Sequence, residues 1–182
     1  MRDNPHYQAI QEHYGDGRAN RSNQLFMNHI DEGLALLDLQ GSSLATKEAF
    51  CLHPLLQIPN TLRDFVTHPD LSIFNPLAFI LAMEYRNKAN AYLCRPKTDH
   101  YTLDDLPVMV LPEVTQMLIA DKVQNYKDFL QYHQVNHERS EQLDNYFGLW
   151  LQHLGVPDEI LAYFIGQLTC TIEELVELKK EG

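Results

Sequence analysis

Apolar residues recur along most of the chain at spacings of three and four residues, and strict alternation of apolar and polar residues is rare. The first pattern is that of one face of an α-helix, whereas strands alternate at every second residue. It predicts an all-α protein that forms a single helical domain over residues 1–182. The expected helices cover residues 5–14, 25–40, 45–57, 61–67, 76–94, 112–134, 138–153, 157–168 and 172–180.

Two glycines mark expected helix ends. Gly41 follows the apolar stretch LALLDLQ, and Gly155 follows YFGLWLQHL. Helices commonly end at a residue with left-handed backbone angles, which glycine adopts without a steric cost. Both glycines are therefore expected to close a helix.

Composition excludes several classes of protein. The net charge is -11, which argues against a broad surface for nucleic acid or anionic membrane. The longest apolar run, PLAFILAM, is far shorter than the roughly 20 residues that cross a bilayer, and MRDNPHYQAI lacks a secretory apolar segment. A cytoplasmic protein is expected, and the formation of a homo-oligomer remains an open possibility.

Three cysteines without a CxxC pair indicate neither a disulfide framework nor a cysteine zinc site.

Three expected helices carry a metal-capable residue where the period calls for an apolar one. They are His29 in FMNHIDEGLALL, His53 in AFCLHPLLQ and Asp121 in MLIADKVQNYKDF. A single histidine in such a place is usually a core residue with a hydrogen-bond partner, and that alternative stays open. Two imidazoles and a carboxylate are nevertheless enough to hold a divalent ion with open positions for water and substrate. Such an ion would lower the pKa of its bound water.

The motifs that contain these residues resemble a known family. HYGDGRANRSNQLFMNHIDEGLALL is similar to the opening of the RelA/SpoT-type HD hydrolase domain, TKEAFCLHPLLQ to the family's run into its HD pair, and IADKVQNYKDF to its LAD…N segment. The matches follow the family's order and cover roughly residues 10–130. The resemblance implies an HD-like helical fold on which the C-terminal helices, residues 138–182, would pack.

The resemblance also implies a ligand set and a substrate class. His29, His53 and Asp121 would bind one divalent ion, manganese by preference, with iron, zinc or magnesium as alternatives. Asn125, one helical turn after Asp121, would lie beside a substrate that is a small phosphorylated nucleotide.

Other residues are candidates for substrate binding on their own spacing. Arg18 and Arg21 in GDGRANR offer a local basic site for an anion. Arg86 and Asn90 share a helix face and could hold a phosphate or a base edge. Tyr132, eleven residues after Asp121, would lie on the same helix face as Asp121. The alternative for the arginine at position 86 is an ordinary surface position. These candidates are Arg18, Arg21, Arg86, Asn90 and Tyr132.

The chain departs from the family at three positions. Pro54 stands where the family has an aspartate, and Gln57 and Ile58 stand where it has an acidic pair needed for hydrolysis. The changes remove one metal ligand and the groups that would orient or deprotonate the attacking water. Glu32 and Glu84 are the candidates for a substitute catalytic carboxylate, although an exposed side chain or a surface ion pair is the alternative for each.

Three functions follow. The favoured one is an HD-fold protein with altered or lost hydrolase activity that retains nucleotide or metal binding. The second is an active divalent-metal-dependent nucleotide pyrophosphohydrolase. The third is a non-enzymatic helical protein-interaction module whose histidines are only structural.

Overall fold

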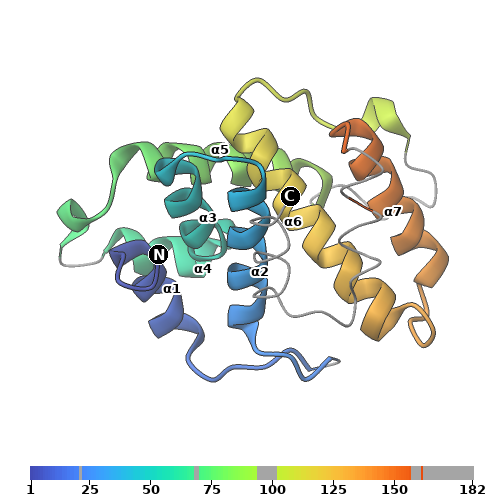
Figure 1. Cartoon of the computed structure of the whole chain (residues 1–182), viewed down its shortest axis with the longest axis horizontal. Coiled ribbons are helices and arrows are strands. Elements are labelled where there is room, and N and C mark those ends of the chain that lie inside the picture. Colours follow the sequence, from blue (N-terminus) through green and yellow to red (C-terminus); the bar gives the residue numbers. More distant parts are fainter. Residues whose placement is uncertain (21, 68–69, 94–101, 157–160, 162–182) are drawn as a thin grey trace, which may run out of the picture.

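The described part of the protein consists of α-helices packed against one another (Figure 1). The computed structural model describes all residues except 21, 68–69, 94–101, 157–160 and 162–182. Within the described residues there is no β-sheet, so the all-α prediction is confirmed, and no described helix is long and apolar enough to cross a membrane. The elements are α1 (Pro5–Tyr14), α2 (Phe26–Leu39), α3 (Leu44–Gln57), α4 (Pro59–Val66), η1 (Leu71–Ile73), α5 (Pro76–Leu93), η2 (Leu103–Asp105), α6 (Pro112–Asp128), η3 (Phe129–His133) and α7 (Ser140–His153).

Both glycines expected to end a helix do so. Gly41 has a φ of 66° and Gly155 a φ of 63°, in the left-handed region that favours glycine. After Gly41, the N–H of Ser42 donates to the carbonyl of Leu37 at 2.9 Å, which is the bond that completes this type of helix end. The prediction of these two ends is confirmed.

Helix α3 is the centre of the core. It packs against α1, α2, α4, α5 and α6, and nine of its fourteen residues are buried. A helix covered on so many sides must be apolar nearly all round, as its sequence LATKEAFCLHPLLQ largely is. The buried polar residues of α3, Thr46, Glu48 and His53, must therefore find partners inside the protein.

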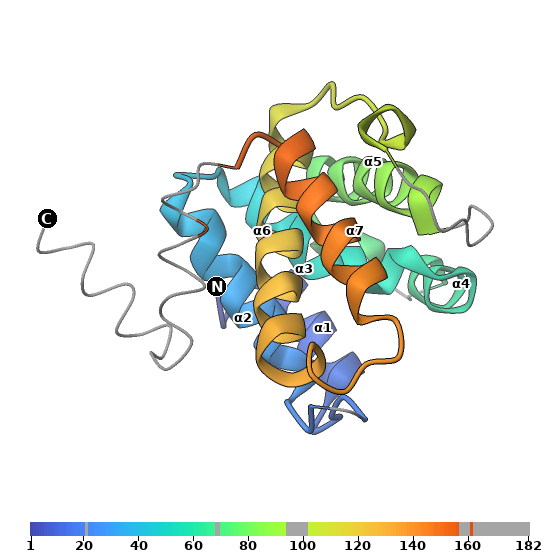
Figure 2. The same cartoon turned by 90° about the vertical axis from the view of Figure 1, so that its right-hand side faces the viewer.

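Helix α6 lies between α2 and α7, as the two views of the ribbon agree (Figures 1 and 2). It also contacts α3 and α5. Residues of α6 that face inward therefore meet residues of α2 and α3. The helices expected at 157–168 and 172–180 lie, apart from residue 161, outside the described residues.

The helix predicted over residues 112–134 changes its winding part-way. It is α-helical to Asp128 and continues as a π-helical turn, η3, from Phe129 to His133. A π turn contains one more residue than an α turn, so the side chains after Asp128 are rotated away from the positions that a regular α-helix predicts. This change affects where Tyr132 points.

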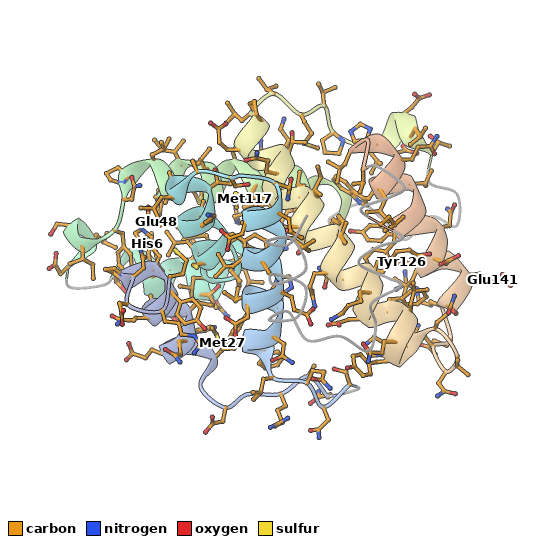
Figure 3. The ribbon with its side chains drawn as sticks, viewed as in Figure 1. His6, Met27, Glu48, Met117, Tyr126 and Glu141 are labelled. Carbon is orange, nitrogen blue, oxygen red and sulfur yellow. The ribbon has the colours of Figure 1, made fainter. Side chains whose placement is uncertain are left out.

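A buried polar network joins α1 to α3 and to the start of α5. The side chain of Glu48 accepts hydrogen bonds from the amide groups of Asn4 at 2.9 Å and Asn75 at 2.7 Å, and His6 lies beside it (Figure 3). The backbone N–H of Asn75 donates to Nε2 of His6, whose Nδ1 donates to Asn4. Burial lowers the pKa of His6, although Glu48 opposes this. The network satisfies Glu48 and gives it a structural role.

Candidate metal centre and its cavity

Three metal-capable side chains from three helices meet where α2, α3 and α6 pack together. The ligand atoms of His29, His53 and Asp121 all lie within 4.8 Å of one another. The Nε2 atoms of the two histidines are 3.3 Å apart, and Oδ1 of Asp121 is 3.6 Å from Nε2 of His29. The structure thus brings together the three residues that the sequence singled out.

The ring of His53 is held by the backbone of its own helix. Its Nδ1 is 2.6 Å from the carbonyl oxygen of Phe50, and a carbonyl oxygen can only accept. Nδ1 therefore carries the hydrogen, and in the neutral ring Nε2 presents a lone pair. Burial, helped by the nearby His29, lowers the pKa of His53 to about 3, so the ring is neutral at physiological pH.

The ring of His29 is held by a side chain of α6. Its Nδ1 is 2.7 Å from Oε1 of Gln124. The amide nitrogen of Gln124 donates to Glu32 at 3.1 Å and to Asp128 at 2.7 Å. Because two carboxylates accept from that nitrogen, the orientation of the amide is set and its oxygen must be the group that faces His29. Nδ1 of His29 therefore donates, and in the neutral ring its Nε2 is also left with a lone pair.

Two lone pairs consequently face each other between the histidines. Nitrogen atoms 3.3 Å apart repel unless a proton or a metal cation lies between them. Ligands of one zinc-like ion bind at about 2.1 Å and so lie no more than about 4.2 Å apart. The separations of His29 from His53 and from Asp121 fall below that limit. Each ring also has the outer hydrogen bond that fixes a metal-binding histidine. The donor set fits one divalent ion held by His29, His53 and Asp121.

Asp121 is buried and ionised. Burial raises its pKa, but Lys122 together with His29 and His53 outweighs this and lowers the value to about 2. Oδ2 of Asp121 pairs with Nζ of Lys122 at 2.8 Å, and Oδ1 accepts from the amide of Asn125 at 2.9 Å. Oδ1 is thus the oxygen that faces the histidines, and Asn125 positions it.

Lys122 is a buried cation beside the cluster. Its side chain is 8% exposed, and its Nζ lies 5.5 Å from the ring centre of Tyr146 and 5.2 Å from that of Trp150. Burial lowers the pKa of Lys122, but the carboxylate of Asp121 outweighs this and raises it well above its ordinary value. The amine is therefore protonated, and a cation near aromatic faces gains further stabilisation.

A cavity of about 500 Å³ opens onto the cluster. Its size is that of a small-molecule site. Lys122 is its one lysine or arginine among the described residues, and the wall combines amide groups with aromatic rings. The rings that line it are those of Tyr14, Phe26, Tyr85, Phe129, Tyr146 and Phe147.

Of the predicted substrate-binding residues that the structure describes, only one lines the cavity. Asn125 lines the cavity. Arg86 and Asn90 both donate to the carbonyl of Gln57 at the end of α3, at 3.2 and 3.0 Å, and neither lines the cavity. Arg18 is exposed and donates to a backbone carbonyl of its own loop, whereas residue 21, the other predicted arginine of this loop, lies outside the described residues.

Tyr132 lies in a different place from the one that α-helical spacing predicts. The π turn rotates it away from the face of Asp121, and it lines a neighbouring cavity together with His133 and His137. It is absent from the wall of the cavity at Asp121. Phe129 occupies that wall instead.

Both predicted catalytic carboxylates form ion pairs, and neither lines the cavity. Glu32 accepts from Gln124 and forms an ion pair with Lys127, so it supports the group that orients His29. Glu84 pairs with Lys88 at 3.3 Å and does not line the cavity. Glu32 therefore helps to hold Gln124, which orients His29, and Glu84 forms an ion pair with Lys88 within its own helix.

The positions that depart from the family pattern lie at or near the site. Pro54 and Gln57 line the cavity, whereas Ile58 is 58% exposed and does not. No carboxylate stands at these three positions. Of the described residues that line the cavity, only Asp121 and Asp128 carry one, and Asp128 is bonded to Gln124.

Two residues of the site were not predicted from the sequence. Lysine and glutamine on a helix are usually solvent-exposed, and both Lys122 and Gln124 stand among other polar residues in ADKVQNYKD. A usable signal existed for Gln124, which is three positions after Asp121 and so shares its face. No comparable spacing signal marks Lys122.

No protein-family model, curated protein or solved structure matches the chain. The resemblance to RelA/SpoT-type HD hydrolases remains a prediction from the motifs.

Replacing Gln124 with leucine is expected to weaken divalent-metal binding about 10- to 100-fold, the usual effect of removing a group that orients a ligand. The leucine cannot accept from Nδ1 of His29, so that ring is free to turn. Titration calorimetry with manganese measures the change, and Gln116→Leu, also on α6 but outside the cavity wall, is the matched control. Equal affinities in the two variants would contradict the role given to Gln124.

Proposed function

We propose that the protein is an HD-type metal-binding protein that holds one divalent ion at His29, His53 and Asp121 and binds a small nucleotide-like ligand beside it, without the hydrolysis that the RelA/SpoT-type family performs. One observation carries the proposal: both imidazoles have Nδ1 fixed by an oxygen acceptor, so that their Nε2 lone pairs face each other across 3.3 Å. Structural histidines would usually present a hydrogen to an acceptor there.

The charges around the cluster favour binding of an ion together with an anionic ligand. The carboxylate of Asp121 is neutralised by Lys122, and both imidazoles serve as neutral ligands. A divalent ion would therefore bring uncompensated positive charge, which an anionic group of a ligand could balance. When bound, the ion would polarise that group or a water molecule.

Loss of hydrolysis is supported by the contacts of the available carboxylates. A general base needs access to the attacking water. Asp121 accepts from Lys122 and Asn125, and Asp128 accepts from Gln124. The family's acidic positions hold Gln57 and Ile58. Binding without turnover accounts for all of these features.

The cavity wall suits a planar ligand with few negative charges. Tyr146, Phe147 and Phe129 are among its rings, and rings of this kind can stack on a nucleobase. A polyphosphate would require several cations, but Lys122 is the only lysine or arginine of the described wall, and it already pairs with Asp121. A nucleoside or nucleoside monophosphate is therefore preferred over a pyrophosphorylated nucleotide.

Metal content tests the first half of the proposal. Protein purified without chelator and incubated with manganese, iron, zinc or magnesium is expected to hold about one ion per chain, measured by mass spectrometry of the metals. His29→Ala should lose the ion, whereas His13→Ala, which changes an exposed histidine outside the cavity wall, should keep it. A wild-type protein that retains none of these ions would overturn the proposal.

Ligand binding and turnover are tested separately. A ligand that binds only the folded protein raises its melting temperature, so nucleosides, monophosphates and pyrophosphorylated nucleotides are compared with manganese present. The first two groups are expected to stabilise the protein and to be recovered unchanged. Release of phosphate or pyrophosphate would instead establish the hydrolase. A panel without any shift would favour the protein-interaction module.

A further inference from the structure

Pro54 lies inside α3, which continues to Gln57. In an α-helix the N–H of residue 54 would donate to the carbonyl of residue 50. Proline has no N–H, and its ring also pushes against the carbonyl four residues earlier. Phe50 is completely buried, and a buried carbonyl without a partner is costly. The helix therefore needs another donor at this point.

That donor is the side chain of the preceding residue. Nδ1 of His53 lies 2.6 Å from the carbonyl oxygen of Phe50. The same bond places the hydrogen on Nδ1 and directs Nε2 toward His29, 3.3 Å away. The missing N–H of Pro54 thus leaves the carbonyl of Phe50 available, and this carbonyl orients the imidazole of His53.

We propose that Pro54 is a positioning residue of the metal centre: by leaving the carbonyl of Phe50 without a helical N–H, it makes that carbonyl the acceptor that fixes His53 as a ligand. The inference rests on the proposed function for its metal, but the orientation of His53 can be measured without any ion. Pro54 would then do two things: it removes the aspartate that the family has at this position, and it orients His53.

Replacement of Pro54 by alanine restores the backbone N–H of this residue. That N–H would compete with Nδ1 of His53 for the carbonyl oxygen of Phe50. The metal-free variant is expected to melt at or above the wild-type temperature because an interior proline disfavours a helix. It should nevertheless bind manganese about 10-fold more weakly, as expected when a group that orients a ligand is lost. A proline with a purely structural role would change the melting temperature and leave the affinity alone.

Nitrogen NMR of the imidazole rings in metal-free protein provides the independent measurement. Wild-type His53 is expected to carry its hydrogen on Nδ1, and Pro54→Ala is expected to show a mixture of the two neutral forms. Leu44→Ala is the control, because it changes an exposed residue of the same helix that lies outside the cavity wall and does not touch the carbonyl of Phe50. It should keep the wild-type form of His53 and a metal affinity within about twofold of wild type, below the usual loss of an orienting group.

The possible results separate the two proposals. A wild-type His53 with its hydrogen on Nε2 would overturn the role of Pro54, as would a Pro54→Ala protein with unchanged His53 and unchanged metal affinity. If Pro54→Ala alters the hydrogen position while neither protein binds an ion, the proposed metal function fails and the positioning of His53 by Pro54 stands.

Discussion

Replacing Asp121 with alanine is expected to lower the free energy of unfolding by about 3–5 kcal/mol, the usual result of leaving one partner of a buried ion pair alone, and to abolish metal binding. Lys122 has an 8% exposed side chain and lies 2.8 Å from the lost carboxylate. The remaining histidines would offer only two ligands. Urea unfolding measures the first effect, and titration with manganese measures the second.

A double variant separates the two consequences. In Asp121→Ala with Lys122→Met, no buried charge is left unpaired, and most of the lost stability should return because removing both partners of a buried pair is often nearly neutral. Metal binding should remain absent. An Asp121→Ala protein as stable as wild type would contradict the buried pair, and one that binds manganese with wild-type affinity would show that Asp121 is not a ligand.

Much of the fold could be predicted because most helices obey local rules. Gly41 and Gly155 end helices for a backbone reason that depends little on the rest of the protein. The π turn from Phe129 to His133 could not be predicted in this way, since its residues in FLQYH keep an ordinary helical composition. It was this turn that separated Tyr132 from Asp121.

The candidate site could be predicted as far as its three candidate ligands and Asn125, which lines the cavity. His29, His53 and Asp121 stand out because each breaks an apolar face. Their orientation depends on contacts that sequence spacing does not encode, such as that between His29 and Gln124, 95 residues apart in the chain. The sequence shows that Pro54 removes a family ligand and a backbone N–H, but the donor that replaces this N–H at the carbonyl of Phe50 becomes visible only when the ring of His53 is in place.

Packing under the site makes a small substitution in α2 costly. A Cβ atom on Gly33 would lie 2.2 Å from two ring carbons of Phe50, and Phe50 is completely buried. Its ring packs against both histidines of the candidate metal centre, with ring centres 5.6 Å from His29 and 4.6 Å from His53. The ring therefore cannot move without disturbing either the core or the candidate metal centre.

Gly33→Ala is therefore expected to lower the free energy of unfolding by about 3 kcal/mol, the upper end of the usual cost of overpacking, and to weaken manganese binding. Gly148→Ala is the matched control in α7, where the added Cβ meets no atom within 4 Å. That change should stabilise the protein by up to about 1 kcal/mol, since alanine favours a helix over glycine.

Urea unfolding and metal titration of both glycine variants test whether Phe50 supports the site. If Gly33→Ala is destabilised through Phe50, adding Phe50→Leu should recover part of the stability by providing space for the new methyl group. The metal affinity should stay low in that double variant, because the ring that packs on His29 and His53 is then missing. Full recovery of both properties would mean that the histidines keep their orientation through Gln124 and the carbonyl of Phe50 alone, with no contribution from the aromatic ring.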